Sequence, residues 1–264
     1  TEIQGAGGKL PYDIMKNTAG YAAYRLLEHI GETDRPLEME IHKKMPFGSG
    51  LGSSAASAAG GVYAVNEFLN TGLSKQEILR FAVEGEQIAD GAFHADNVGP
   101  SLLGGMILIR DNETLDIKKL HIPPGLYAAV IYPHVEVLTR ESRGILKQEV
   151  NFKDVIRQQG NLGAFVAGMY TSDYGMISRS LQDLLVEPQR AHLIPHFYEM
   201  KEKAIAVKAL GFSISGAGPS MFALCDNSGI AESVLEEAEK LYSDKKVAIT
   251  TYLSKINHEG AIRF

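Results

Sequence analysis

The sequence predicts an α+β protein of two domains, and three observations support this prediction. First, 264 residues suffice for two ordinary domains that share a cleft. Second, the first half contains a strand that leads into a glycine-rich loop and then a helix. Third, the second half reads as strand, helices, a strand pair, helix and strand. That order suits a split βαβ, ferredoxin-like domain.

The composition excludes several classes of protein. Hydrophobic residues make up 45% of the chain, charged residues make up 22%, and the net charge is −6. No apolar run approaches the roughly 20 residues that a membrane span needs. Without a Lys/Arg block, a nucleic-acid surface is not expected either. We therefore expect no membrane and no nucleic-acid partner.

The cysteine content points to a reducing compartment. Cys225 is the only cysteine, so an internal disulfide is excluded, and its apolar neighbours predict a small core residue. The start of the sequence has no signal-peptide pattern. We therefore expect a cytoplasmic protein.

The loop before the first long helix has the features of a phosphate site. Gly48, Gly50 and Gly52 permit tight turns and close approach of a ligand, and the pair Ser53-Ser54 opens the helix. Loop amides, first-turn amides and the helix dipole would then converge on one anion. The alternative is a helix-entry loop without a ligand.

Two common nucleotide loops do not fit this stretch. A Walker A loop needs Lys directly before the Ser/Thr, where Gly52 stands here. In a dinucleotide fingerprint the third glycine would come one residue later, where this chain has Ser53.

The first half contains further local signals. Asn17 is the expected N-cap of a helix that Gly31 ends, and apolar alternation over residues 37–45 predicts a half-buried strand. The glycine-loop helix, through about Leu69, is rich in Ala and Gly and is expected to be central and buried. Ser74 opens the next helix with a capping box.

Two glutamates on that next helix are expected to face different ways. At about 100° per residue, Glu84 falls on the polar side with Arg80, while Glu86 falls on the apolar half. A carboxylate on an inward face is costly unless it is paired. Glu86 is therefore either in a structural ion pair or facing a metal.

The polar loop of residues 90–105 is a second candidate site. It places His94, Asp96 and Asn97 within four positions, a density typical of functional loops. The alternative is a set of Asx turns that cap a helix beginning after Pro100. Strands are predicted at residues 106–110 and 126–133. The intervening residues 122–125 suggest a domain crossing, which gives domains of residues 1–124 and 125–264.

The second half is predicted as helices at residues 152–170 and 174–185, a loop from residue 187, and a helix that ends at Gly211. A glycine turn at residues 215–220 joins two strands, and a helix at 229–242 and a strand at 247–252 follow. The turn's amides could also face a ligand. Singly, Arg143 and Arg190 look like surface residues or salt-bridge partners.

Taken together, these motifs resemble the homoserine kinase family of the GHMP kinases. The glycine loop and the Ser-Gly-Ala-Gly-Pro-Ser block mark the superfamily. The His-Ala-Asp-Asn, Thr-Arg-Glu-Ser-Arg and Glu-Pro-x-Arg blocks point to homoserine. The matching blocks occur in the family's order, at residues 16–20, 46–56, 86, 94–97, 139–143, 187–190, 193–195 and 215–220.

The resemblance implies a two-domain GHMP kinase fold, with an N-terminal domain like domain 2 of ribosomal protein S5 and a ferredoxin-like C-terminal domain. It also implies phosphorylation of the side-chain hydroxyl of L-homoserine by ATP, on the way to threonine, and allows a homodimer. Asn17 would lie near the adenine, and Ser54 and Glu86 would bind Mg²⁺. The resemblance assigns the ATP phosphates to Pro46, Phe47, Gly48, Ser49, Gly50, Leu51, Gly52, Ser53, Ser54, Ala55 and Ala56.

The same resemblance places His94, Asn97, Thr139, Arg143 and Arg190 around the amino acid, with Asn97 and Arg143 as catalytic residues. These residue types also fit the reaction independently of the resemblance. Phosphoryl transfer requires that the phosphate donor and the hydroxyl be aligned and that the phosphate charge be neutralised. Mg²⁺ prefers few hard oxygen ligands, and arginines can hold an α-carboxylate that a sugar does not offer. Asp96 is the one attractive acid of the loop, but the resemblance suggests transfer without a dedicated base.

The sequence departs from the family at its start. Homoserine kinases begin with strands that carry a Pro-Ala-Ser-x-Ala-Asn-Leu-Gly-Pro-Gly-Phe-Asp block, and nothing in residues 1–16 replaces it. We expect either a leading segment before this sequence or a first domain without these N-terminal strands. Two alternatives to a homoserine kinase remain: a GHMP kinase for a mevalonate- or shikimate-like alcohol, and a catalytically silent nucleotide-binding regulator.

Overall fold

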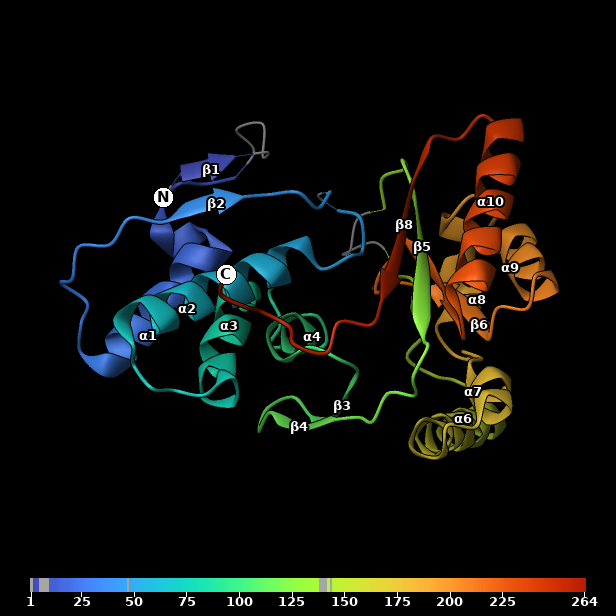
Figure 1. The fold of residues 1–264 in the computed structure, drawn as a ribbon, viewed down its shortest axis with the longest axis horizontal. Coiled ribbons are helices and arrows are strands. Elements are labelled where there is room, and N and C mark those ends of the chain that lie inside the picture. The colour runs from blue at the N-terminus through green and yellow to red at the C-terminus, as the bar shows by residue number, and fades with distance from the viewer. Residues whose placement is uncertain (1, 5–9, 47, 138–141, 143) are drawn as a thin grey trace. The chain divides into compact units, whose positions relative to one another are not determined.

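The computed structural model describes residues 2–4, 10–46, 48–137, 142 and 144–264 (Figure 1). It divides the chain into two compact units. The first consists of Thr1–Phe47, Gly52–Lys119 and Asn257–Phe264, and the second of Gly48–Leu51 and Leu120–Ile256. Residues 48–51 of the glycine loop thus fall in the second unit, and residues 257–264 fall in the first. The domains of residues 1–124 and 125–264 stay a prediction.

The first unit is built mainly of helices. Its elements are β1 (Glu2–Gln4), the 3₁₀ turn η1 (Ile14–Lys16), α1 (Thr18–Ile30), β2 (Glu40–His42), α2 (Ser53–Leu69), α3 (Lys75–Asp90), α4 (Val98–Leu103), β3 (Ile107–Asp111) and β4 (Asp116–Lys119). β1 and β2 pair in parallel, and β3 and β4 pair antiparallel.

The helix ends follow local chemistry. Asn17 caps α1, Gly31 ends it in the left-handed region, and the Ser74 capping box opens α3, as predicted. Two predictions need correction. The strand of residues 37–45 is reduced to the three residues of β2, and α4 begins at Val98, two residues before Pro100. Proline fits there because the first turn of a helix needs no bonded N–H.

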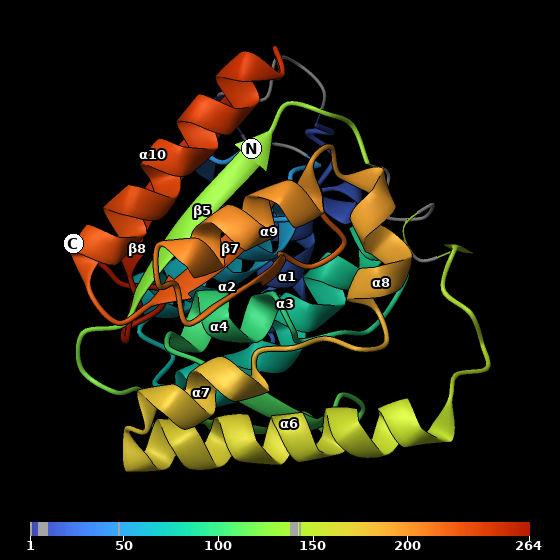
Figure 2. The same ribbon diagram turned by 90° about the vertical axis from the view of Figure 1, so that its right-hand side faces the viewer.

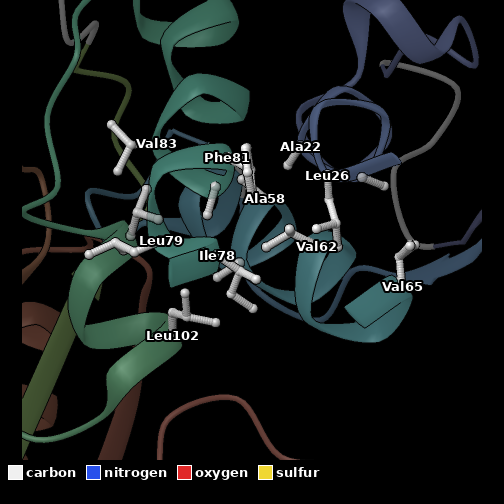
Figure 3. Close-up of a cluster of buried hydrophobic side chains, with 14 of the residues drawn as sticks. Ala22, Leu26, Ala58, Val62, Val65, Ile78, Leu79, Phe81, Val83 and Leu102 are labelled. Atoms are coloured by element: carbon white, nitrogen blue, oxygen red, sulfur yellow. The ribbon is translucent and has the colours of Figure 1, made fainter. Parts of the chain in front are cut away.

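The core of the first unit is where α1, α2 and α3 meet (Figure 3). Leu26, Val62, Ile78 and Leu79 are fully buried in it. Gly61 sets the crossing of α2 over α1, because a Cβ there would lie 2.6 Å from the Ala19 carbonyl oxygen. The prediction of a buried, small-residue central helix is confirmed.

The second unit carries a four-stranded sheet and its helices. Its elements are β5 (Tyr127–Pro133), α6 (Phe152–Thr171), α7 (Tyr174–Ser180), α8 (Glu187–Arg190), the 3₁₀ turn η2 (Ala191–Leu193), α9 (Phe197–Ala206), β6 (Gly211–Ile214), β7 (Met221–Cys225), α10 (Ser228–Asp244) and β8 (Ile249–Lys255).

The sheet has the order β6-β7-β5-β8, and all its pairs are antiparallel. β5 and β6 are therefore parallel to each other with β7 between them, which is the split βαβ that the sequence predicted. α9 and α10 lie on one face of the sheet (Figure 2). Cys225 is buried in this core, and burial raises the pKa of its thiol to about 12, so it stays protonated and acts as a small core residue.

Three predicted boundaries in the second unit were wrong. α7 ends at Ser180, α9 ends at Ala206 before Gly211 opens β6, and residues 187–190 form α8 in place of a loop. The Asp183 carboxylate accepts hydrogen bonds from the amides of residues 185–187. This side chain therefore binds the backbone that leads into α8 and the amide of its first residue, a local signal that propensity alone does not register.

Two neighbouring glycines of α2 should respond oppositely to alanine. Gly61→Ala places its Cβ against Ala19 and should lower the free energy of unfolding by about 1–3 kcal/mol. Gly60→Ala meets no atom of the described residues within 4 Å and should raise it by about 0.5–1 kcal/mol, because alanine loses less backbone entropy. Urea unfolding of both variants measures the difference, and shifts of the same sign would contradict the crossing.

Candidate active site

The glycine loop adopts the backbone conformation that its residues permit. Gly48, Gly50 and Gly52 have φ values of 63°, 76° and 73°, in the left-handed region that favours glycine. Gly52 is the N-cap of α2, and among the described residues no side chain caps this helix end. First-turn amides and the positive end of the helix dipole are therefore available to an anion.

The two serines after Gly52 face different partners. The Ser53 hydroxyl donates to the Met45 carbonyl, so this residue anchors the loop to the protein. The Ser54 hydroxyl donates to Oε1 of Glu86 on α3 at 2.6 Å. Ala55 is fully buried one position later in the same turn. Only the second serine is therefore joined to an acidic side chain.

Glu84 and Glu86 separate as the helix geometry predicted. Glu84 accepts hydrogen bonds from Arg25 at 2.7 Å and from Arg80 at 3.2 Å, on the polar side of α3. Glu86 turns toward Ser54 in α2. Within the described part of the chain, no three His, Cys, Asp or Glu side chains are grouped to hold a metal. A hard cation here would therefore rely on the Ser54 and Glu86 oxygens, and Mg²⁺ accepts so few protein ligands.

In the loop of residues 94–97, Asn97 lies beside the start of α2. Asn97 lies against Gly52, because a Cβ at position 52 would be 3.1 Å from Asn97 Oδ1. The Ala95 amide donates to Asn112 Oδ1, which fixes the loop. His94 and Asp96 are exposed. The structure therefore brings Asn97 to the glycine loop and places His94 at the surface of the same segment.

A small pocket of about 200 Å³ lies beside the first turn of α2. Its lining is apolar at Leu10, Pro11, Ile41 and Ala89 and polar at Lys16, Asn17, Thr18, Lys43, Ser54 and Ser57.

Asn17 shapes the wall of this pocket. Its Oδ1 accepts from the amides of Ala19 and Gly20, and its Nδ2 donates to the Pro11 carbonyl at 3.0 Å. The cap was predicted, but the bond to residue 11 was not, because it holds an irregular segment with no signature of its own.

Sequence reasoning missed Lys43. Its ammonium donates to the Ser53 carbonyl and to the Ser57 hydroxyl, each at 2.6 Å. Burial lowers its pKa from the ordinary value, while attraction to Glu86 opposes that shift. The signal was available, because residues 37, 39 and 41 alternate on the inward side of the predicted strand and position 43 continues that series.

In the second unit, residues 48–51 pack on the 215–220 turn. The Ser215 hydroxyl donates to the Gly50 carbonyl at 2.9 Å, and the Ser220 amide donates to the carbonyl of Ser49, which is buried. A Cβ at Gly50 would lie 2.6 Å from the Gly218 carbonyl oxygen. Gly50 is therefore required both for its φ and for this close approach.

Two further sequence blocks, those of Ser142 and Arg190, meet at the same turn. The Ser142 hydroxyl donates to the Ala217 carbonyl at 2.8 Å. Arg190 donates from Nε to the Ser142 carbonyl at 2.9 Å and from Nη1 to the Gly216 carbonyl at 3.2 Å. Arg190 is thus half-buried beside the turn and not a plain surface arginine.

Glu187 supports this arrangement. The sequence analysis included it only as part of the block of residues 187–190 and gave it no role of its own. Its carboxylate is buried and accepts from Lys201 at 2.5 Å and from Ser213 at 3.1 Å. These bonds tie α8, which carries Arg190, to α9 and β6. Three predicted site residues, Phe47, Thr139 and Arg143, lie outside the described residues.

The chain is similar to known kinases in both sequence and structure. The GHMP kinases N terminal domain matches residues 17–105, and the GHMP kinases C terminal domain matches residues 153–244. A homoserine kinase of Chlorobium phaeovibrioides is 42% identical over 99% of this chain and 84% of its own length. A homoserine kinase of Chloroherpeton thalassium is 43% identical over 92% of this chain and 77% of its own.

The chain belongs to the homoserine kinase family of the GHMP kinases. The crystal structure of homoserine kinase from Cytophaga hutchinsonii matches 98% of this chain and 82% of that one, with a TM-score of 0.93 and 44% identity. The predicted two-domain GHMP kinase fold is confirmed. As a member of this kinase family, the protein is an enzyme with ATP as co-substrate. In the part of the chain that the structure describes, no helix is long and apolar enough to cross a membrane.

Alanine at two glycines of the loop should separate backbone strain from steric clash. Gly48→Ala and Gly50→Ala both pay for a left-handed φ, about 1–2 kcal/mol each. Only Gly50→Ala also meets the 215–220 turn, whereas a Cβ at Gly48 has no atom of the described residues within 4 Å. The free energy of unfolding should therefore fall by about 1–3 kcal/mol more in Gly50→Ala. Equal losses in chemical denaturation would contradict the docking of this loop.

Proposed function

We propose that this protein transfers the γ-phosphoryl group of ATP to the side-chain hydroxyl of L-homoserine. The hydroxyl oxygen bonds to the γ-phosphorus, the bond from that phosphorus to the bridging oxygen breaks, and ADP, O-phospho-L-homoserine and a proton result. The observation that carries the proposal is Arg190, which two carbonyls hold beside the 215–220 turn. A guanidinium fixed in this way suits the carboxylate of a free amino acid.

The first unit supports the nucleotide part of the proposal. We assign the ATP phosphates to residues 46–56, because positive-φ glycines and the uncapped start of α2 suit a polyanion. We assign the adenine to the pocket beside Asn17, whose apolar wall and size of about 200 Å³ suit a base better than a whole nucleotide.

Ser54 and Glu86 fit a bound Mg²⁺, since their oxygens already meet at 2.6 Å and are the hard donors it prefers. Bound there, the ion would neutralise charge on the phosphates. Ser54 would have to release its hydrogen bond to Glu86 to turn an oxygen lone pair to a cation.

The amino-acid part of the proposal rests on Arg190 and on residues of segments 94–97 and 139–143. Arg190 and Arg143 would hold the α-carboxylate, and His94 and Thr139 would line the remaining substrate surface. Asn97, which lies against Gly52 at the start of the phosphate loop, would orient the reacting groups. Alignment and charge neutralisation supply most of the catalysis in phosphoryl transfer, so these roles suffice without a dedicated base.

The decisive experiment is ADP release with homoserine, mevalonate and shikimate measured in parallel. We expect turnover with homoserine alone. Turnover with mevalonate or shikimate instead would replace the acceptor. Saturable ATP binding without release for any of the three alcohols would identify a nucleotide-binding regulator.

Neutralising the two glutamates of α3 should separate their roles. Glu86→Gln should raise the Mg²⁺ concentration for half-maximal activity at least about tenfold, because a ligand charge is lost. Glu84→Gln removes two ion pairs from the polar side of α3 but should leave this concentration unchanged. The measurement is a Mg²⁺ titration of initial rates. Equal shifts in the two variants would show that Glu86 is not a metal ligand.

Removing Arg190 should impair homoserine binding selectively. Losing a charge-assisted contact costs about 2–3 kcal/mol, so Arg190→Ala should raise the KM for homoserine roughly 30- to 150-fold with little change for ATP. Arg190→Lys should recover part of the loss, since it keeps the charge without the planar fork. Arg157→Ala, at an exposed position of α6, should cost under about 1 kcal/mol.

Steady-state kinetics with each substrate varied in turn measure these effects, after circular dichroism confirms folding. A fall in ATP affinity as large as that in homoserine affinity would move Arg190 to the nucleotide side of the reaction.

A further inference from the structure

Lys43 occupies a position that its exposed neighbour Lys44 does not. It directly follows β2 and turns inward to the side of α2, where its ammonium contacts the Ser53 carbonyl and the Ser57 hydroxyl. Ser57 in turn donates to the Ser53 carbonyl at 3.1 Å. These bonds place a cation on the first turn of α2, the turn that also carries Ser54.

Holding the Lys43 ammonium at this partly buried position costs free energy, because burial removes part of its hydration. Burial disfavours the charged ammonium and lowers its pKa, and the Glu86 carboxylate offsets only part of that effect. A neutral donor such as the glutamine amide could donate hydrogen bonds here without the larger desolvation penalty of a full charge. Tethering β2 to α2 therefore does not by itself explain why the side chain carries a charge.

The pocket beside Asn17 indicates where the charge acts. Lys43, Ser54 and Ser57 all line this pocket of about 200 Å³, to which we assign the adenine, so phosphates that run from the pocket to Ser54 pass close to the ammonium. Two other charged groups belong to the surroundings: Lys16, which is exposed and paired with Asp13, and Glu86. Because the whole chain carries a net charge of −6, attraction of a polyanion depends on local cations of this kind.

We propose that Lys43 is an ATP-affinity residue, which supplies positive charge to the phosphates at the first turn of α2. The inference rests on the proposed nucleotide site and deepens it. In the apo protein the ammonium is held by Ser53 and Ser57 and attracted by Glu86. With ATP bound, the same fixed cation faces phosphate oxygens at no cost of reorganisation. Glu86 remains available to Mg²⁺, because the nucleotide then supplies a counter-charge for Lys43.

Three variants distinguish charge from tethering. Lys43→Gln keeps hydrogen-bond donors and removes the charge, Lys43→Arg keeps both, and Lys44→Gln removes the same charge from an exposed neighbour. We expect Lys43→Gln to weaken ATP binding about 10- to 100-fold by isothermal titration calorimetry, the ordinary effect of losing a contact to a charged group. Lys43→Arg and Lys44→Gln should stay within about twofold of the unmodified protein.

Each other result overturns the inference. Wild-type affinity in Lys43→Gln, or equal losses in Lys43→Gln and Lys43→Arg, would leave Lys43 as a tether only. Equal losses of ATP affinity in Lys43→Gln and Lys44→Gln would show that only the net charge of the protein matters and not the position of Lys43. If Lys43→Gln does not fold, Ser57→Ala decides, because it removes one of the two hydrogen bonds of the tether and keeps the charge: retained ATP affinity supports the inference, and a tenfold or larger loss, on the order of 1.4 kcal/mol, contradicts it. If the unmodified protein binds no ATP, the proposed function itself fails.

Discussion

The structure depends on the glycine loop being fixed at both of its ends. Residues 48–51 are held by the 215–220 turn, 165 positions away in sequence, through the Ser215 hydroxyl and the Gly50 carbonyl. One residue later, Gly52 opens α2 with a left-handed backbone. A side chain at Gly50 would collide with the turn, and one at Gly52 would press on Asn97. Glycine is therefore needed at positions 50 and 52 both for the left-handed backbone and for the close contacts with the turn and with Asn97.

The helices of the first unit determine where the charged groups of the site stand. α1 crosses α2 at Gly61 and α3 at Gly85, where a Cβ would lie 2.6 Å from the Ala19 and Thr18 carbonyl oxygens respectively. These close crossings fix α2 against α3 and so bring Ser54 to Glu86 at 2.6 Å. Partly buried polar groups carry a desolvation cost, and the rigid packing of the helices keeps them in place before any ligand arrives.

Local sequence signals were sufficient where the responsible atoms are close in the chain. The Asn17 cap, the Ser74 capping box, the start of α2 and the separation of Glu84 from Glu86 all depend on residues within one or two helical turns. The predictions were wrong where a distant or unrecognised side chain intervened. α8 begins where the Asp183 carboxylate accepts from the amide of Glu187, and the strand of residues 37–45 kept only three residues paired, since the pairing of a strand depends on its neighbour and not on its own pattern.

The amino-acid sequence alone predicted the family, the helix ends at Asn17, Gly31 and Ser74, the glycine conformations of the loop before α2 and the βαββαβ order of the second unit. These features are written in residue type and spacing, because caps, turns and periodicity act over a few positions. The packing of the fold brings Lys43 to the first turn of α2, Asn17 to residue 11, and Arg190 between the Ser142 and Gly216 carbonyls. Each of these contacts joins segments whose meeting depends on how the helices and the sheet pack. Strand alternation indicates that Lys43 points inward, but a single sequence does not name the partner of any of these side chains.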